Sequence, residues 1–214
     1  MNTPIKIDFV SDVSCPWCVI GLRALQDAIA RVEDVATTEI HFQPFELNPD
    51  MVAEGEDTTE HLAKKYRLTP EQAASNREAI RARGAALGFE FRLDKRNRIY
   101  NTFDAHRLLH WAELEGHQLA LKEALFRTYF TEGESPASHE VLIRLAGEVG
   151  LDPVRAQQIL ASDTYAGDVR ERERFYLDNG IHAVPAVIIN ERFLISGGQP
   201  AEVFERALRQ AAAG

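Results

Sequence analysis

The sequence has few cysteines, few basic residues and no long apolar run. Only two cysteines occur among 214 residues, which excludes the disulfide framework of a small secreted domain. No stretch approaches the roughly 18 uncharged apolar residues of a membrane-spanning helix, so we expect no membrane span. The 24 Lys and Arg face 33 Asp and Glu, giving a net charge of −9. This balance argues against a nucleic-acid partner or an anionic membrane surface.

The beginning of the chain also lacks a targeting pattern. Residues 1–18 read MNTPIKIDFVSDVSCPWC, without the apolar run of a secretory signal. We therefore expect a cytoplasmic protein, where structural disulfides are rare. A length of 214 residues with 45% hydrophobic residues suffices for a buried core without metal or disulfide support.

The first part of the chain predicts a strand, a helix and a second strand. Residues 4–10 alternate apolar and polar side chains, which is typical of a strand. Ser14 is expected to cap the following helix, with Pro16 in its first turn. Apolar residues spaced by three and four continue that helix to about Val32. Residues 38–45 predict the second strand.

The middle of the chain is helical and the end returns to strands. From about residue 58 to 179 the helical pattern is almost continuous, and Thr69-Pro70-Glu71-Gln72 predicts a capping box within it. Residues 186–189 and 193–195 predict a hairpin, followed by a helix over 201–212. The order is therefore β-α-β, a helical block, then α-β-β-α, which predicts an α/β domain carrying a helical insertion.

Both cysteines lie in Cys15-Pro16-Trp17-Cys18, between the first strand and the first helix. At i and i+3 on a first helical turn, two thiols share a face and can close a disulfide. The unpaired N–H groups and partial positive charge of a helix N-terminus favour thiolate over thiol. Cys15 lies at the outer end, so we predict that it attacks, while Cys18 resolves the mixed disulfide. The pair thus predicts a redox-active Cys15–Cys18 disulfide.

Other uses of cysteine and histidine have weaker support. A structural staple closing so short a loop would contribute only ~2 kcal/mol. A zinc site would need two cysteines from another chain. His106, His110 and Glu113 have metal-ligand spacing on one predicted helix, but no second motif in the sequence offers further ligands. We expect no metal site.

Several motifs together resemble a known family. The strand followed by Ser11-Asp12-x-x-Cys15-Pro16-Trp17-Cys18, the late Val184-Pro185 and the helical insertion resemble the DsbA-like thioredoxin-fold family. The similarity is greatest to its FrnE-like cytoplasmic branch, which is often grouped with 2-hydroxychromene-2-carboxylate isomerases. Also similar are Gln43-Pro44-Phe45-Glu46-Leu47-Asn48, Asn101-Thr102-Phe103-Asp104-Ala105-His106-Arg107 and Ser196-Gly197-Gly198-Gln199-Pro200.

The resemblance implies a fold and its division. The fold is α/β, a thioredoxin fold with a large all-helical insertion between its βαβ and ββα halves. The expected parts are the first half at 1–57, the insertion at 58–179, whose last helix packs on the sheet, and the second half at 180–214.

The resemblance also implies a substrate loop. It assigns Pro185 a cis peptide bond beside the cysteines and gives the backbone of Val184 the task of pairing with a substrate chain. X–Pro bonds are the ones that tolerate the cis form. His182, three residues before Pro185, is a candidate to border the same groove.

Three residues near the cysteines are expected to influence the reduction potential of the Cys15–Cys18 pair. Periplasmic relatives in the family carry His at the position of Trp17, which can add charge near the thiolate. Pro16 withholds a backbone donor. Asp12 adds a negative charge three residues before Cys15, or bonds local N–H groups. We therefore expect a potential nearer thioredoxin's, about −270 mV, than DsbA's, about −120 mV.

These features predict an enzyme, a thiol–disulfide oxidoreductase acting on protein or peptide thiols and disulfides. It should need no bound cofactor, with glutathione as a candidate co-substrate. The alternative is a glutathione-dependent isomerase or kappa-type glutathione transferase on the same fold. Those relatives use one Ser or Cys at the helix tip, so Cys18 favours the oxidoreductase. A binding module that uses only the Pro185 groove is a third interpretation.

Overall fold

The computed structural model describes residues 2–214, and the chain forms two compact units. The sheet unit runs to Phe45 and resumes over Arg170–Gly214, while the helical unit is Glu46–Val169. The sequence analysis placed the boundaries after residues 57 and 179, from the order of the predicted helices and strands. Those boundaries stay predictions.

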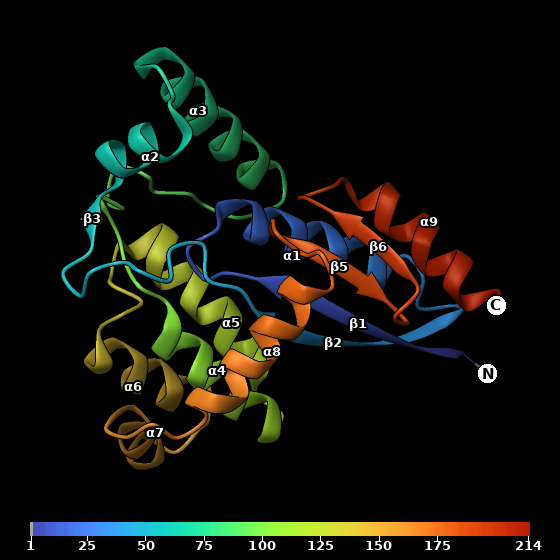
Figure 1. Cartoon of the computed structure of the whole chain (residues 1–214). Helices are drawn as coiled ribbons and strands as arrows, with labels where there is room; N and C mark the ends of the chain where they lie inside the picture. Colours follow the sequence, from blue (N-terminus) through green and yellow to red (C-terminus); the bar gives the residue numbers. More distant parts are fainter. Residues whose placement is uncertain (1) are drawn as a thin grey trace. The chain divides into compact units, whose positions relative to one another are not determined.

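A four-stranded sheet organises the sheet unit (Figure 1). Its strands are β1 (Thr3–Ser11), β2 (Ala36–Pro44), β5 (Ala186–Ile189) and β6 (Phe193–Ser196), in the order β2-β1-β5-β6. β2 runs parallel to β1, whereas β5 is antiparallel to β1 and β6 to β5. The parallel pair needs a crossover connection and the antiparallel pair needs only a short turn. Residues 190–191 make that turn, both with positive φ.

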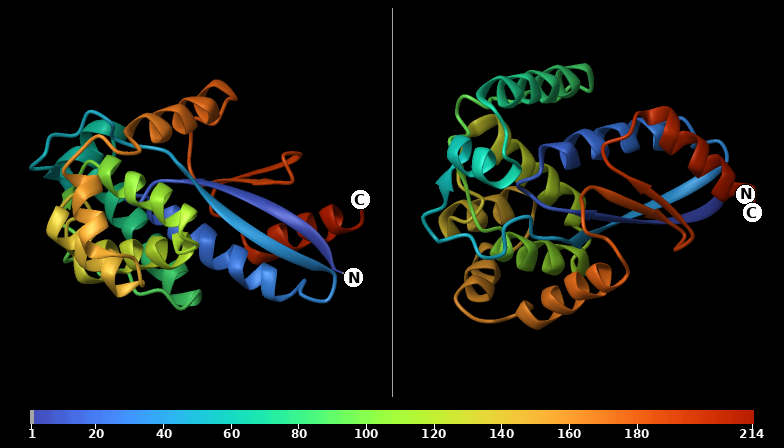
Figure 2. Two further views of the ribbon diagram at one scale, coloured as in Figure 1. Left: turned by 90° about the horizontal axis from the view of Figure 1, so that it is seen from below. Right: turned by 45° about the horizontal axis from the view of Figure 1, so that its top comes forward.

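Two helices cover one face of this sheet. α1 (Pro16–Ala30) connects β1 to β2, and α9 (Ala201–Ala212) follows β6. They lie side by side in Figures 1 and 2, and α9 packs on β1, β2 and β5. Alternate residues of β1 meet apolar residues spaced by three and four on the helices. The buried side chains of this core include Ile5, Ile7, Phe9, Leu22, Leu25, Phe204 and Leu208.

The start of α1 differs from the sequence-based expectation. The N-cap is Cys15 rather than Ser14, and no side chain caps the helix. The Ser14 hydroxyl instead donates to the Asp12 carboxylate at 3.0 Å. A short polar side chain in a turn can bond locally as readily as it caps, and here the local bond is formed. Pro16 does occupy the first turn, as predicted.

The helical unit contains a run of helices joined by short turns. They are α2 (Thr58–Tyr66), α3 (Pro70–Ala86), α4 (Phe103–Leu114), α5 (Gln118–Arg127), α6 (His139–Glu148) and α7 (Pro153–Leu160). α8 (Ala166–Asp178) begins in this unit and ends in the sheet unit. A small antiparallel sheet of β3 (Glu56–Asp57) and β4 (Arg98–Ile99) was not predicted, because two-residue strands leave no pattern.

Helix starts in this unit follow local sequence signals. Thr69 and Gln72 form the predicted capping box at α3. The Ser138 hydroxyl accepts from the backbone of α6, and the Asp152 carboxylate does so at α7. α5 passes into a π-helical turn, Thr128–Glu132, that ends at Gly133 with φ +82°. The caps therefore fix where these helices begin.

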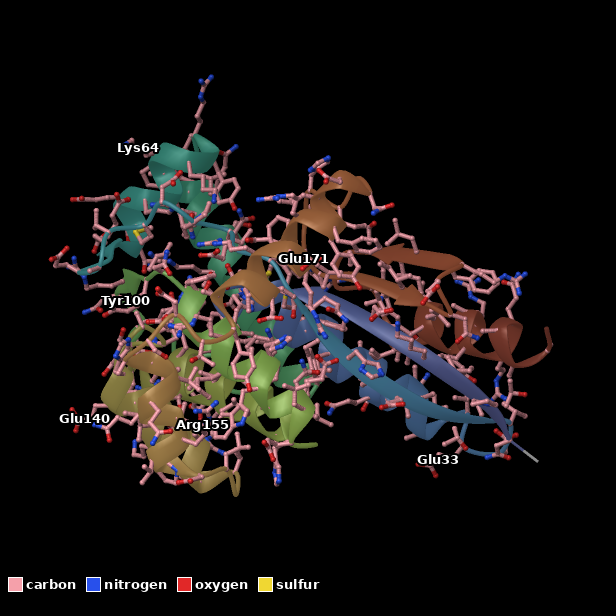
Figure 3. The ribbon with its side chains drawn as sticks, turned by 60° about the horizontal axis from the view of Figure 1, so that its bottom comes forward. Glu33, Lys64, Tyr100, Glu140, Arg155 and Glu171 are labelled. Carbon is pink, nitrogen blue, oxygen red and sulfur yellow. The ribbon has the colours of Figure 1, made fainter. Side chains whose placement is uncertain are left out.

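Aromatic rings fill much of this core. Phe91 and Phe130 meet edge-on with centroids 5.3 Å apart. The ring of Tyr100, labelled in Figure 3, is likewise edge-on to that of Tyr129 at 6.4 Å. The brief alternation at Phe89, Phe91 and Leu93 forms no strand; the Phe89 and Phe91 rings instead contact each other at a tilt, with centroids 4.8 Å apart. Within residues 2–214, no helix combines the length and apolar character needed to span a bilayer.

Candidate active site

The two cysteines lie on the first turn of α1, as the sequence predicted. Cys15 is the N-cap and Cys18 follows one turn later, with its N–H donating to the Cys15 carbonyl at 3.1 Å. Both are free thiols. Cys15 retains 3% of its exposed surface and Cys18 none. The outer thiol is therefore the more accessible, although it is more buried than the sequence suggested.

The loop before β5 faces Cys15. The Val184–Pro185 peptide bond is cis, as the resemblance implied. The Cys15 Sγ lies 3.7 Å from the Val184 carbonyl oxygen and can donate its proton there. This contact joins residues far apart in the sequence, so the end of the chain completes the surroundings of the first thiol.

Asp12 is held by its own turn. Its carboxylate accepts from the Ser14 N–H at 3.1 Å and from the Ser14 hydroxyl at 3.0 Å. Its backbone carbonyl accepts from the Cys15 N–H at 3.2 Å. Asp12 is 1% exposed. Of the two expectations, the local bonding is formed, and an effect of Asp12 on the couple stays a prediction.

The remaining predicted residues differ in exposure. Pro16 and Trp17 are half-buried between the two thiols. His182 is exposed on the loop after α8. The functional roles of these three residues remain predictions.

Glycines pack this region together in a way that the sequence analysis missed. A Cβ on Gly21 of α1 would lie 3.1 Å from Pro185 Cγ. A Cβ on Gly198 would lie 3.0 Å from the Trp17 carbonyl oxygen. The Gly197 N–H donates to the Pro185 carbonyl at 2.8 Å, with φ at +82°. A glycine inside a helix and a Gly-Gly pair are signals of close backbone approach, and they could have pointed here.

A buried carboxylate on β1 was also missed. Asp8 is 3% exposed. Gln43 Nε2 donates to it at 2.8 Å, and Lys6 Nζ lies 3.1 Å away. Burial works against the charge of Lys6, but the hydrogen bonds and charges of Asp8 and Glu191 raise its pKa. The available signal was an acidic residue directly before the apolar pair Phe9-Val10 within a predicted strand.

In the helical unit, Arg107 clamps a turn. Its guanidinium donates to the carbonyls of Ile159, Ser162 and Thr164 and pairs with Asp104 at 2.7 Å. The Asp104 carboxylate also contacts His139 at 2.7 Å. The turn between α7 and α8 is therefore fixed by a buried side chain.

The histidines that have metal-ligand spacing in the sequence, His106 and His110, lie on α4, as does Arg107. The His110 ring packs on Tyr165, with centroids 5.0 Å apart. Among residues 2–214, no three His, Cys, Asp or Glu side chains are grouped to hold a metal.

A cavity of about 460 Å³ also lies within the helical unit. At its edge His61 bridges Glu56, at 2.6 Å, and Asn48, at 2.9 Å. Lys64, which Figure 3 shows extending from α2, lies on the same rim. None of the predicted site residues lines this cavity, whose walls are Leu47, Asn48, Pro49, Asp50, Met51, Glu56, His61, Lys64 and Lys65.

Comparison with known proteins agrees with this geometry. The DSBA-like thioredoxin domain family matches residues 6–209, and the chain belongs to that family. The crystal structure of a probable DsbA oxidoreductase, SCO1869 from Streptomyces coelicolor, is 34% identical with a TM-score of 0.91, covering 98% of this chain and 90% of that one. The protein YwbO of Bacillus subtilis (strain 168) is 28% identical, covering 95% of this chain and 96% of its own.

More distant structures share the fold. Cytosolic disulfide reductase DsbM from Pseudomonas aeruginosa, solved with GSH, is 17% identical with a TM-score of 0.66, covering 98% of this chain and all of its own. A 2-hydroxychromene-2-carboxylate isomerase is 13% identical with a TM-score of 0.71, covering 96% and 95%. The predicted class, a thioredoxin-like DsbA fold with a helical insertion, is confirmed.

Proposed function

We propose that this protein is a thiol–disulfide oxidoreductase in which Cys15 exchanges with substrate and Cys18 resolves. The observation that carries the proposal is the placement of both cysteines on the first turn of α1, with the outer thiol against the Val184 carbonyl. The helix N-terminus favours the Cys15 thiolate. The Val184 backbone then offers hydrogen bonds to a peptide that approaches Cys15.

The exchange balances in two steps. A substrate thiolate attacks Cys15 Sγ, the Cys15–Cys18 bond breaks, and its electron pair leaves on Cys18, which takes a proton. The second substrate thiolate attacks the substrate sulfur of the mixed disulfide, and Cys15 leaves with that electron pair and takes the second proton. The substrate is oxidised and the protein reduced by two electrons. Reduction of a substrate disulfide is the reverse sequence.

Protein or peptide thiols and glutathione are the proposed partners. Two glutathione molecules would reduce the Cys15–Cys18 disulfide and leave as one glutathione disulfide. The likeness to a reductase solved with GSH supports this co-substrate. That neighbour is a cytosolic reductase, which supports a cytoplasmic location, and the sequence motifs support the FrnE-like branch. No bound cofactor is needed for these steps.

A glutathione-dependent isomerase or kappa-type transferase is the second candidate. It is favoured by the likeness to 2-hydroxychromene-2-carboxylate isomerase. Such a reaction needs one activated thiol and no resolving cysteine, so Cys18 distinguishes the two functions.

The test is to equilibrate the protein in glutathione buffers of known ratio and to measure its disulfide by mass spectrometry. We expect a reversible Cys15–Cys18 disulfide in the wild type. Cys18→Ser should accumulate a glutathione adduct on Cys15, because no thiol resolves it, whereas Cys15→Ser should not form the reversible pair. Oxidoreductase activity that persists undiminished in Cys18→Ser would refute the two-cysteine mechanism. Isomerase activity that survives the same change would favour the second candidate.

A further inference from the structure

The segment Ser196–Pro200, called here the Gly-Gly loop, contacts both sides of the candidate site. Its Gly197 N–H donates to the Pro185 carbonyl at 2.8 Å. The loop is bonded internally as well, because the backbone and side-chain N–H groups of Gln199 donate to the Gly197 and Ser196 carbonyls, each at 2.9 Å. It should therefore move as one piece together with the residues before β5.

A side chain at Gly198 would be crowded. An added Cβ would lie 3.0 Å from the Trp17 carbonyl oxygen, 3.4 Å from Ile20 Cγ2 and 3.5 Å from Trp17 Cε3. The nearest obstacle is the backbone of α1, and a helical backbone yields less readily than the end of a flexible side chain. A methyl group at this position is accommodated mainly by moving the Gly-Gly loop away from α1.

Such a movement would be transmitted toward Cys15 by the hydrogen bond between Gly197 and Pro185 and by the Val184–Pro185 peptide unit. The Gly197 N–H holds Pro185, and the preceding Val184 carbonyl lies 3.7 Å from Cys15 Sγ. A carbonyl oxygen accepts a hydrogen bond from a thiol but repels a thiolate. The position of the Val184 carbonyl therefore determines which of these two contacts it makes with the Cys15 sulfur.

We propose that Gly198 is a positioning residue: because it has no side chain, the Gly-Gly loop can hold the Val184 carbonyl against the Cys15 thiol. The helix N-terminus and the Val184 carbonyl both face the sulfur of Cys15. The proposal deepens the proposed function, since it concerns the thiol that is inferred to attack. It assigns the Ser196–Pro200 motif a part in setting the reactivity of that thiol.

The test adds one methyl group at each of two glycines in a Cys18→Ser background, where Cys15 is the sole cysteine. Gly198→Ala is the test variant, and Gly167→Ala is the matched control because no atom lies within 4 Å of its added Cβ. The rate of iodoacetamide modification of Cys15 is measured against pH by intact mass. Circular dichroism and thermal unfolding establish that each variant is folded.

For Gly198→Ala we expect the midpoint of the curve of alkylation rate against pH to move roughly half a pH unit toward acid. Below that midpoint, Cys15 should react about threefold faster than in the parent protein. Gly167→Ala should keep the midpoint of the parent. A purely structural role for Gly198 would lower the unfolding temperature without moving this midpoint. If Gly198→Ala does not fold, Gly21→Ala decides, because its added Cβ would lie 3.1 Å from Pro185 Cγ and would displace the Val184–Pro185 segment directly.

Folded variants with an unchanged or more alkaline midpoint would overturn the proposal. The alkylation measurement needs no disulfide exchange. The proposed function fails separately if the wild-type protein with both cysteines does not equilibrate with glutathione. The two failures are therefore distinguishable.

Discussion

The sheet unit and the helical unit both contain close approaches at glycine, but these approaches join different segments. In the sheet unit, Gly21 and Gly198 bring the first helix against much later segments of the chain, beside the cysteines. In the helical unit, Gly84 packs against the nearby residues 89–91, and a polar side chain, Arg107, holds the backbone of the α7–α8 turn. The contacts of the sheet unit therefore shape the surroundings of Cys15, whereas those named in the helical unit involve neither cysteine.

The difference predicts that reactivity and stability respond to different substitutions. Changes at the close approaches of the sheet unit should alter Cys15. Changes at the polar contacts of the helical unit should alter folding and leave Cys15 as it is.

The largest effect is expected for Arg107→Met. The guanidinium is 5% exposed and pairs with Asp104 at 2.7 Å, and its loss removes one donor from that carboxylate and from three carbonyls. Removing one partner of a buried pair costs about 3–5 kcal/mol, and we expect the lower end here because Asp104 is 30% exposed and keeps His139. Urea unfolding should show this loss of unfolding free energy. Arg107→Lys should lose an intermediate amount, because lysine keeps the positive charge but lacks the planar set of donors of a guanidinium. A changed alkylation midpoint of Cys15 in the folded Arg107 variant would break the separation between the units.

Gly21→Ala and Gly167→Ala place the same methyl group in a helix of each unit. In an open helix position, alanine is favoured over glycine by up to about 1 kcal/mol, and Gly167 has open space around its added Cβ. At Gly21 the contact with Pro185 opposes that gain, since overpacking costs about 1–3 kcal/mol. Thermal unfolding should therefore show Gly167→Ala stabilised and Gly21→Ala destabilised. Equal stabilisation of both would mean that the contact at Pro185 is not tight.

Trp17→His should make the couple more oxidising. An imidazole between the cysteines can carry a positive charge that stabilises the Cys15 thiolate and hence the reduced form. We expect a shift of about 30 mV, equivalent to about 1.4 kcal/mol. Equilibration with glutathione and mass spectrometry measures it, and Trp17→Phe provides an uncharged aromatic control. A shift toward more reducing potentials would contradict the argument.

The smallest effect concerns pH and Glu56. The hydrogen bond from His61 lowers the pKa of this carboxyl; burial opposes the shift, while the charges of His61 and Lys64 add to it. A carboxyl whose pKa is lower in the folded state stabilises that state above its unfolded pKa. That contribution is lost as pH falls through the folded pKa. Urea midpoints from about pH 6 to pH 3 should fall less in Glu56→Gln than in the wild type. Parallel pH profiles for the two proteins would refute this role.

Much of the fold could be predicted because its signals are local. The Thr69–Gln72 capping box and the strand at 186–189 occur where the sequence indicated. The motif Cys15–Cys18 could be placed on a helix start for the same reason. Ser14 was wrongly expected to cap because a nearby acceptor, Asp12, competes for its hydroxyl.

The rest of the site depends on contacts that no local pattern encodes. The approach of Val184 to Cys15 and of Gly198 to Trp17 joins segments separated by most of the chain. Asp8 is buried because of its partners Gln43 and Lys6, of which Gln43 comes from another strand. Such pairings depend on the register of the sheet, which the hydrophobic pattern and the turns set jointly.

The sheet order also determines when the site is completed during synthesis. β1, α1 and β2 leave the ribosome before the helical unit, and they carry both cysteines and a parallel pairing of their own. β5 pairs with β1 only after the whole helical unit has been made. Because chains are made from the N-terminus, a nascent polypeptide contains its thiol pair before Val184 and Gly198 exist. Translation of the segment that carries Val184 and Gly198 therefore completes the surroundings of the two thiols.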